Sequence, residues 1–131
     1  MPGGFESQGF FEDTFSETVL QTLRDFEKTG KPIASICVGA LPPAKSGILN
    51  GKRATIYHLM NGKRRKQLAE LGTKVVDASI VVDENKTTPT SPATAIDVAL
   101  ALLEKLTSQK NAERIRHLMG FATPDCGISM R

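Results

Sequence analysis

The nine residues from Pro32 to Ala40 constrain the fold more than any other stretch, because they read as a buried strand that turns abruptly into a helix. Cys37 stands at the turn, with the small residues Ser35 and Gly39 two places away on either side. Such a turn, the nucleophile elbow, strains its central residue and needs small neighbours there. It directs free helix amides at the sulfur, which favours the thiolate and can stabilise an oxyanion. The pattern alone leaves an elbow and a buried structural thiol equally open.

Helical and strand-like segments alternate along the chain, and this predicts an α/β fold with mostly parallel strands. Two prolines, Pro42 and Pro43, are tolerable near the first turn of the helix after Cys37. Thr94 and Asp97 form a capping-box pattern before an apolar helix that should pack against the sheet. The first expected helix begins at residue 13 or 16 and ends at 30, and four more are expected at 38–46, 63–71, 94–106 and 111–119. The expected strands are 33–37, 54–57, 74–76 and 80–82.

Composition indicates one globular domain in a reducing, cytoplasmic setting. The chain has 131 residues, 40% hydrophobic and 24% charged, with a net charge of +3. No aromatic-interleaved basic stripe accompanies this charge, so nucleic-acid binding is not expected, and residues 63–66 (KRRK) read as a solvated helix face. Two cysteines, Cys37 and Cys126, make no disulfide framework, and neither a signal peptide nor a membrane-spanning apolar run is present.

Several ordered motifs together are more specific than the elbow alone. The series closely resembles the ThiJ/PfpI superfamily, relatives of the class I glutamine amidotransferases, from Pro2 to about Phe121. The resemblance implies a flavodoxin-like three-layer sandwich with a mostly parallel sheet, formed by residues 1–120 and followed by a tail at 121–131. It also raises the elbow reading of Cys37 above the structural one. The motifs are PGG at 2–4, GKPIASICVGA at 30–40, GILNGKRAT at 47–55, VDEN at 82–85 and PATAIDVAL at 92–100.

The resemblance assigns roles around Cys37, which it makes the nucleophile. The amides of Gly4 and Val38 match the family's oxyanion donors, with Gly3 and Gly39 as supporting small residues. The alternative for Gly3 and Gly4 is a plain turn. The protease-like branch has histidine where this chain has Val38, which argues against peptide hydrolysis. The expected substrate is a small carbonyl or amide compound, with no metal or organic cofactor, and a homodimer is expected.

The proton-transferring residue is ambiguous. The family usually carries a histidine at the end of the strand that ends near residue 57, and His58 is the candidate. Counted from Thr55, however, Tyr57 occupies the position where many relatives have histidine. One step along a strand turns a side chain to the opposite face, so either residue could face Cys37. His117 has no comparable argument and is expected to be exposed.

The family pattern has further elements before the glycine loop. Family members carry two more strands, a helix and a glutamate that contacts the cysteine, and neither Glu6 nor Glu12 matches that glutamate's motif. We therefore expect a fold that is incomplete at its amino end, either a fragment of a longer product or one completed by a partner. The leading function is cysteine-dependent small-molecule chemistry of the glyoxalase, deglycase or amidase kind. The alternatives are a non-catalytic stress or redox-sensing protein whose Cys37 is oxidised, or an inactive remnant.

Overall fold

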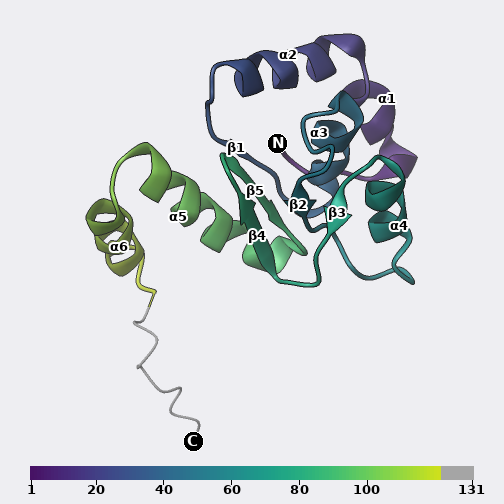
Figure 1. The fold of residues 1–131 in the computed structure, drawn as a ribbon. Coiled ribbons are helices and arrows are strands. Elements are labelled where there is room, and N and C mark those ends of the chain that lie inside the picture. Colours follow the sequence, from purple (N-terminus) through teal and green to yellow (C-terminus); the bar gives the residue numbers. More distant parts are fainter. Residues whose placement is uncertain (122–131) are drawn as a thin grey trace, which may run out of the picture.

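The computed structural model describes residues 1–121, and Figure 1 shows their arrangement as an α/β fold. Cys126 and all but the first residue of the expected tail lie outside this range. Three short 3-10 helices cover Glu6–Gln8, Cys37–Ala40 and Pro92–Thr94. The helices are α1 (Phe10–Thr14), α2 (Glu17–Lys28), α3 (Leu41–Ser46), α4 (Lys63–Glu70), α5 (Ala95–Leu106) and α6 (Gln109–Leu118). The strands are β1 (Ile33–Ala34), β2 (Arg53–Ala54), β3 (Lys74–Val75), β4 (Ile80–Asp83) and β5 (Lys86–Pro89).

The strands form two small sheets that side chains join. One sheet has the order β1-β5-β4, with β1 and β5 parallel and β4 and β5 antiparallel, while β2 and β3 pair in parallel in the other. The Arg53 amide donates to the carboxylate of Asp83 at 2.7 Å. The Thr55 amide donates to the hydroxyl of Thr88 at 2.9 Å. These bonds between backbone and side chain hold β2 beside the β4–β5 hairpin.

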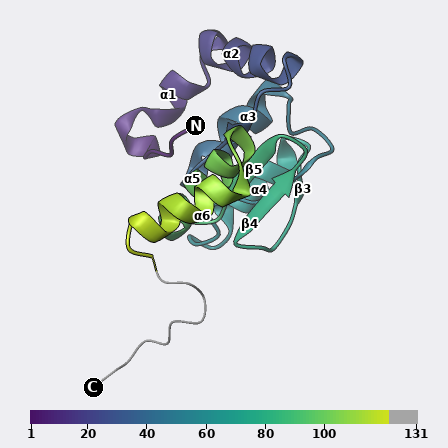
Figure 2. The same cartoon turned by 90° about the vertical axis from the view of Figure 1, so that its left-hand side faces the viewer.

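Helices lie on both sides of the strands, which gives the three-layer arrangement of the flavodoxin-like fold. In Figure 1, α5 and α6 lie on one side, while α2, α3 and α4 lie on the other, and Figure 2 shows α5 and α6 in front of the strands. The main core lies on the α3 and α4 side, because apolar residues of α3, α4 and β2 are buried there together. Its buried members are Ala40, Leu41, Ala44, Leu49, Ala54, Ile56 and Leu68.

Most expected helices are present, but their ends differ. Pro42 and Pro43 lie in the first turn of α3, as predicted. Phe15, expected on the apolar face of the first predicted helix, instead follows the separate helix α1, because α2 begins at Glu17. The capping box is wrong: Thr94 makes no side-chain cap, and its hydroxyl donates to the carbonyl of Ser91 at 2.7 Å.

The strand β5 was not predicted at all, although it lies in the centre of its sheet. The sequence of Lys86–Pro89 is polar, yet all four residues are buried. The Lys86 ammonium is satisfied by the carboxylate of Glu27 at 2.7 Å and by the side chain of Asn85 at 2.8 Å. The carboxylate of Glu27, 59 positions away in the sequence, therefore makes burial of this strand possible.

Candidate active site around Cys37

Cys37 occupies the turn between β1 and the helical segment that leads into α3. The Ser35 amide donates to the carbonyl of Thr87 at 3.0 Å, which extends the pairing of β1 with β5 one residue beyond Ala34. Cys37 then adopts a left-handed conformation with φ 56°, and its side chain is half-buried. Non-glycine residues rarely adopt this conformation, and it recurs where a fold holds a functional side chain under strain.

The first residues of the chain pack directly against this turn. The Met1 nitrogen donates to the carbonyl of Ala34 at 2.7 Å, and the Ile36 amide donates to the carbonyl of Met1 at 3.0 Å. A Cβ on Gly39 would lie 2.6 Å from the carbonyl oxygen of Pro2 and 2.7 Å from that of Met1. Glycine is therefore required at position 39 because another backbone segment crosses it.

Gly3 lies against Cys37 itself. A Cβ on Gly3 would lie 2.9 Å from the Cβ of Cys37 and 3.4 Å from the amide nitrogen of Val38. A Cβ on Gly4 would instead lie 2.3 Å from the ring of Phe10. A larger residue at position 3 would therefore clash with the cysteine turn, whereas one at position 4 would clash with an aromatic side chain of α1.

The amides of Gly4 and Val38 are free to donate. Neither nitrogen has a hydrogen-bond acceptor within residues 1–121. Val38 is the second residue of a helical segment, where amides lack a partner in their own helix. Two free backbone donors, one on each of two segments that meet at Cys37, can donate hydrogen bonds to a developing oxyanion.

Tyr57 and His58 differ in their surroundings, as alternation along an extended segment requires. Tyr57 is half-buried and packs against the core cluster, whereas His58 is exposed. Their ring centres are 6.3 Å apart. His58 lines a hollow of about 200 Å³ together with Arg65, Asp77, Ala78, Ser79 and Thr90. No hydrogen bond joins either residue to Cys37 in the described part of the chain, so the assignment of the base stays a prediction. His117 is exposed, as expected.

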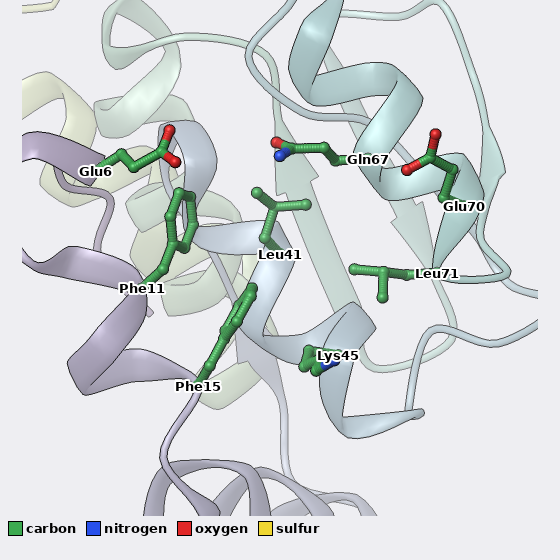
Figure 3. A pocket seen from close by; sticks show the side chains of 8 residues that line it. All are labelled: Glu6, Phe11, Phe15, Leu41, Lys45, Gln67, Glu70 and Leu71. Atoms are coloured by element: carbon green, nitrogen blue, oxygen red, sulfur yellow. The ribbon is translucent and has the colours of Figure 1, made fainter.

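A larger hollow opens between α1, α3 and α4. Figure 3 shows Phe11 and Phe15 on one wall, Leu41 and Lys45 of α3 in the middle, and residues of α4 opposite. Its volume is about 330 Å³, and Glu6, Gln67, Glu70 and Leu71 complete its lining. The floor is apolar and the rim carries charges of both signs.

The 3-10 helix Glu6–Gln8, just after the glycine motif at 2–4, is joined to α4 by an ion pair that sequence reasoning missed. The guanidinium of Arg64 lies 3.1 Å from the carboxylate of Glu6. The hydrogen bond from Arg64 and the nearby charge of Lys63 lower the pKa of the Glu6 carboxyl. Arg64 also lies over the ring of Phe11, 5.0 Å from its centre. The sequence offers no signal for these contacts, because they join residues more than 50 positions apart.

Two kinds of site are not seen in the described residues. Within 1–121, His, Cys, Asp and Glu side chains nowhere gather in groups of three that could hold a metal ion. Among the helices of the same range, none combines the length and the apolar character needed to cross a membrane.

Comparison with known proteins decides the family. Residues 1–105 match the DJ-1/PfpI family. The chain belongs to the DJ-1/PfpI family. The crystal structure of Drosophila melanogaster DJ-1beta superposes with a TM-score of 0.79 at 29% identity, covering 92% of this chain and 62% of that one. The fold and the resemblance to the ThiJ/PfpI superfamily are thereby confirmed.

Two curated members of the DJ-1/PfpI family carry the names of enzymes. The "Glutathione-independent glyoxalase DJ-1" of Schizosaccharomyces pombe is 37% identical over 112 residues, which are 83% of this chain and 54% of that protein. The "Isonitrile hydratase" of Pseudomonas putida is 29% identical over 122 residues, 93% of this chain and 50% of that protein. The chain thus spans about half the length of these curated relatives.

Proposed function

We propose that this chain carries a cysteine-dependent active site for small carbonyl compounds, with 2-oxoaldehydes as the leading substrate class and amides as the second. The observation that carries the proposal is the left-handed Cys37 beside two unpartnered backbone amides. The names of the glyoxalase and isonitrile hydratase relatives support small-molecule chemistry. We further propose that the protein acts as a cytoplasmic homodimer and needs no metal or organic cofactor.

In the proposed reaction the Cys37 thiolate adds to the aldehyde carbon, and the carbonyl electron pair moves to oxygen. The alkoxide that forms accepts hydrogen bonds from the amides of Gly4 and Val38. A base then moves the proton from the former aldehyde carbon to the adjacent carbon, which converts the adduct into a thioester of a 2-hydroxy acid. Water hydrolyses the thioester and releases the thiolate, so the net reaction adds one water and needs no oxidant.

The proton carrier is His58 or Tyr57, and the surroundings of the two residues suggest different roles. An imidazole accepts a proton at neutral pH, whereas a phenol is a poor base and mainly donates a hydrogen bond. Loss of a true general base lowers the rate by about 100-fold or more. Loss of a hydrogen-bond donor alone costs about 1 kcal/mol, or about fivefold.

The test measures conversion of methylglyoxal to lactate by the full chain. Cys37→Ala is expected to abolish turnover, while Cys126→Ala, the matched thiol control, leaves it unchanged. The turnover rates of His58→Ala and Tyr57→Phe are each compared with that of His117→Ala, the exposed histidine control. Turnover that survives in Cys37→Ala would overturn the proposal.

If no 2-oxoaldehyde or amide is turned over, mild peroxide followed by mass spectrometry separates the remaining alternatives. A two-oxygen adduct confined to Cys37 would identify a redox-sensing thiol. Absence of both turnover and adduct would identify an inactive family member. The expected homodimer is tested separately, by light scattering of the protein as it elutes from a size-exclusion column.

A further inference from the structure

The chain contains two Asn-Gly dipeptides, Asn50-Gly51 and Asn61-Gly62, which the proposed function does not use. Asn-Gly is the dipeptide most prone to deamidation, because a following residue without a side chain lets its amide nitrogen reach the asparagine side-chain carbonyl. Both asparagines are exposed. The sequence alone therefore treats the two sites as equals, and only the structure can distinguish them.

The Asn61 site is strained and its attacking nitrogen is free. Met60, Asn61 and Gly62 have consecutive positive φ angles of 61°, 58° and 70°. The left-handed conformation is unfavourable for Met60, whereas asparagine tolerates it, so opening of this turn releases strain chiefly at Met60. Within residues 1–121 the Gly62 amide has no hydrogen-bond acceptor, and nothing lies within 4 Å of the position a Cβ on Gly62 would take.

The Asn50 site is held in place. The Gly51 amide donates to the carbonyl of Gly72 at 2.9 Å, and the Asn50 amide donates to the carbonyl of Gly47 at 3.1 Å. The side-chain oxygen of Asn50 lies 2.5 Å from the position of a Cβ on Gly72, so this side chain is packed against a neighbouring loop. Attack by the Gly51 nitrogen requires these contacts to break first.

We propose that Asn61 is a site of spontaneous deamidation in the folded protein and that Asn50 is protected. The Gly62 nitrogen loses its proton and bonds to the side-chain carbonyl carbon of Asn61, and the side-chain nitrogen leaves as ammonia. Water then opens the cyclic imide at one of its two carbonyls, giving aspartate or isoaspartate. The net change replaces an amide with a carboxylate and consumes one water, without any oxidant or enzyme.

The new carboxylate changes the charge of a particular surface. Asn61 lies just before α4, whose first four residues (63–66) are all basic and whose N-cap Gly62 provides no side-chain cap. A negative charge there complements both these cations and the amino end of the helix. Deamidation thus adds one negative charge beside a hollow of about 430 Å³, lined by Phe5, Glu6, Ser7, Met60, Lys63 and Arg64.

The test follows both sites in one sample. The folded chain is incubated at 37 °C and mildly alkaline pH in ¹⁸O-labelled water, then digested with trypsin at acidic pH and analysed by mass spectrometry. The label marks only deamidation that occurred during incubation. Trypsin separates the sites, because Asn50 falls in the peptide SGILNGK (46–52) and Asn61 in ATIYHLMNGK (54–63).

We expect Asn61 to convert at least about fivefold faster than Asn50, the factor that corresponds to one net hydrogen bond holding the Gly51 nitrogen. The same chain in urea is the control, and there the two sites should convert at equal rates. The variant Asn61→Gln should lose the labelled product from the 54–63 peptide without affecting the 46–52 peptide. Equal or faster conversion of Asn50 in the folded chain, or the same rate ratio in urea, would overturn the proposal.

Discussion

Replacing Gly39 by alanine tests whether the amino-terminal segment fixes the shape of the cysteine turn. The new Cβ would lie 2.6 Å from the carbonyl oxygen of Pro2, so this segment must retreat by about 0.8 Å to reach an ordinary contact of 3.4 Å. Such a shift is enough to break both the bond from the Ile36 amide to the carbonyl of Met1, now 3.0 Å, and the bond from the Met1 nitrogen to the carbonyl of Ala34, now 2.7 Å. At about 1 kcal/mol for each bond, the free energy of unfolding falls by about 2 kcal/mol.

A loss of about 2 kcal/mol corresponds to a melting temperature lower by roughly 5–8 °C, measurable by circular dichroism. The same displacement should alter the rate at which iodoacetamide alkylates Cys37, because the displaced segment contacts the turn. Gly30→Ala is the matched control, since it adds a Cβ at a positive φ with nothing within 4 Å. It should lower the melting temperature slightly and leave Cys37 alkylation unchanged. If Gly39→Ala changes neither quantity, the proposed role of this contact is wrong.

Three further predictions address the thiol, the strand pairing and the buried cation. Iodoacetamide at neutral pH should label Cys37 faster than Cys126 in the folded chain, and equal rates would remove the chemical basis of the elbow hypothesis. The Arg53 amide lowers the pKa of the Asp83 carboxyl below its ordinary value of 3.8, so its stabilising effect is complete above that value and is lost as the pH falls through the lowered pKa. Urea unfolding of Asp83→Asn should accordingly vary less with pH below about pH 4 than unfolding of the unmodified chain. Lys86→Met should lower the free energy of unfolding by about 2 kcal/mol in urea, because it leaves the partly buried carboxylate of Glu27 without its cationic partner, and an unchanged midpoint would contradict this.

The cysteine turn could be predicted from the sequence because its requirements are local. A short apolar run, a small residue on each side of Cys37 and a following helix all lie within nine residues. The structure realises this pattern with a left-handed Cys37. Its role as nucleophile stays a prediction, because conformation alone does not establish reactivity.

The strand β5 could not be predicted because its burial depends on distant residues. Residues 86–89 received no predicted element, because they contain no apolar alternation and Pro89 cannot donate to a ladder. Their polar groups find partners in other elements. The Lys86 ammonium pairs with the carboxylate of Glu27 in α2, and the Thr88 hydroxyl accepts a hydrogen bond from the amide of Thr55, directly after β2. No periodicity within four residues can reveal such partners.

The glycine loop and the cysteine turn explain each other's composition. Gly3 must be small because Cys37 lies against it, and Gly39 must be small because Met1 and Pro2 cross it. Each segment alone would tolerate alanine, so neither glycine has a local reason to be there. Two segments more than 30 residues apart in the sequence therefore form one packing unit, and any substitution that separates them should disturb the cysteine and both candidate oxyanion donors together. Because each segment restricts which residues the other can contain, the two motifs together say more about the family than either motif alone.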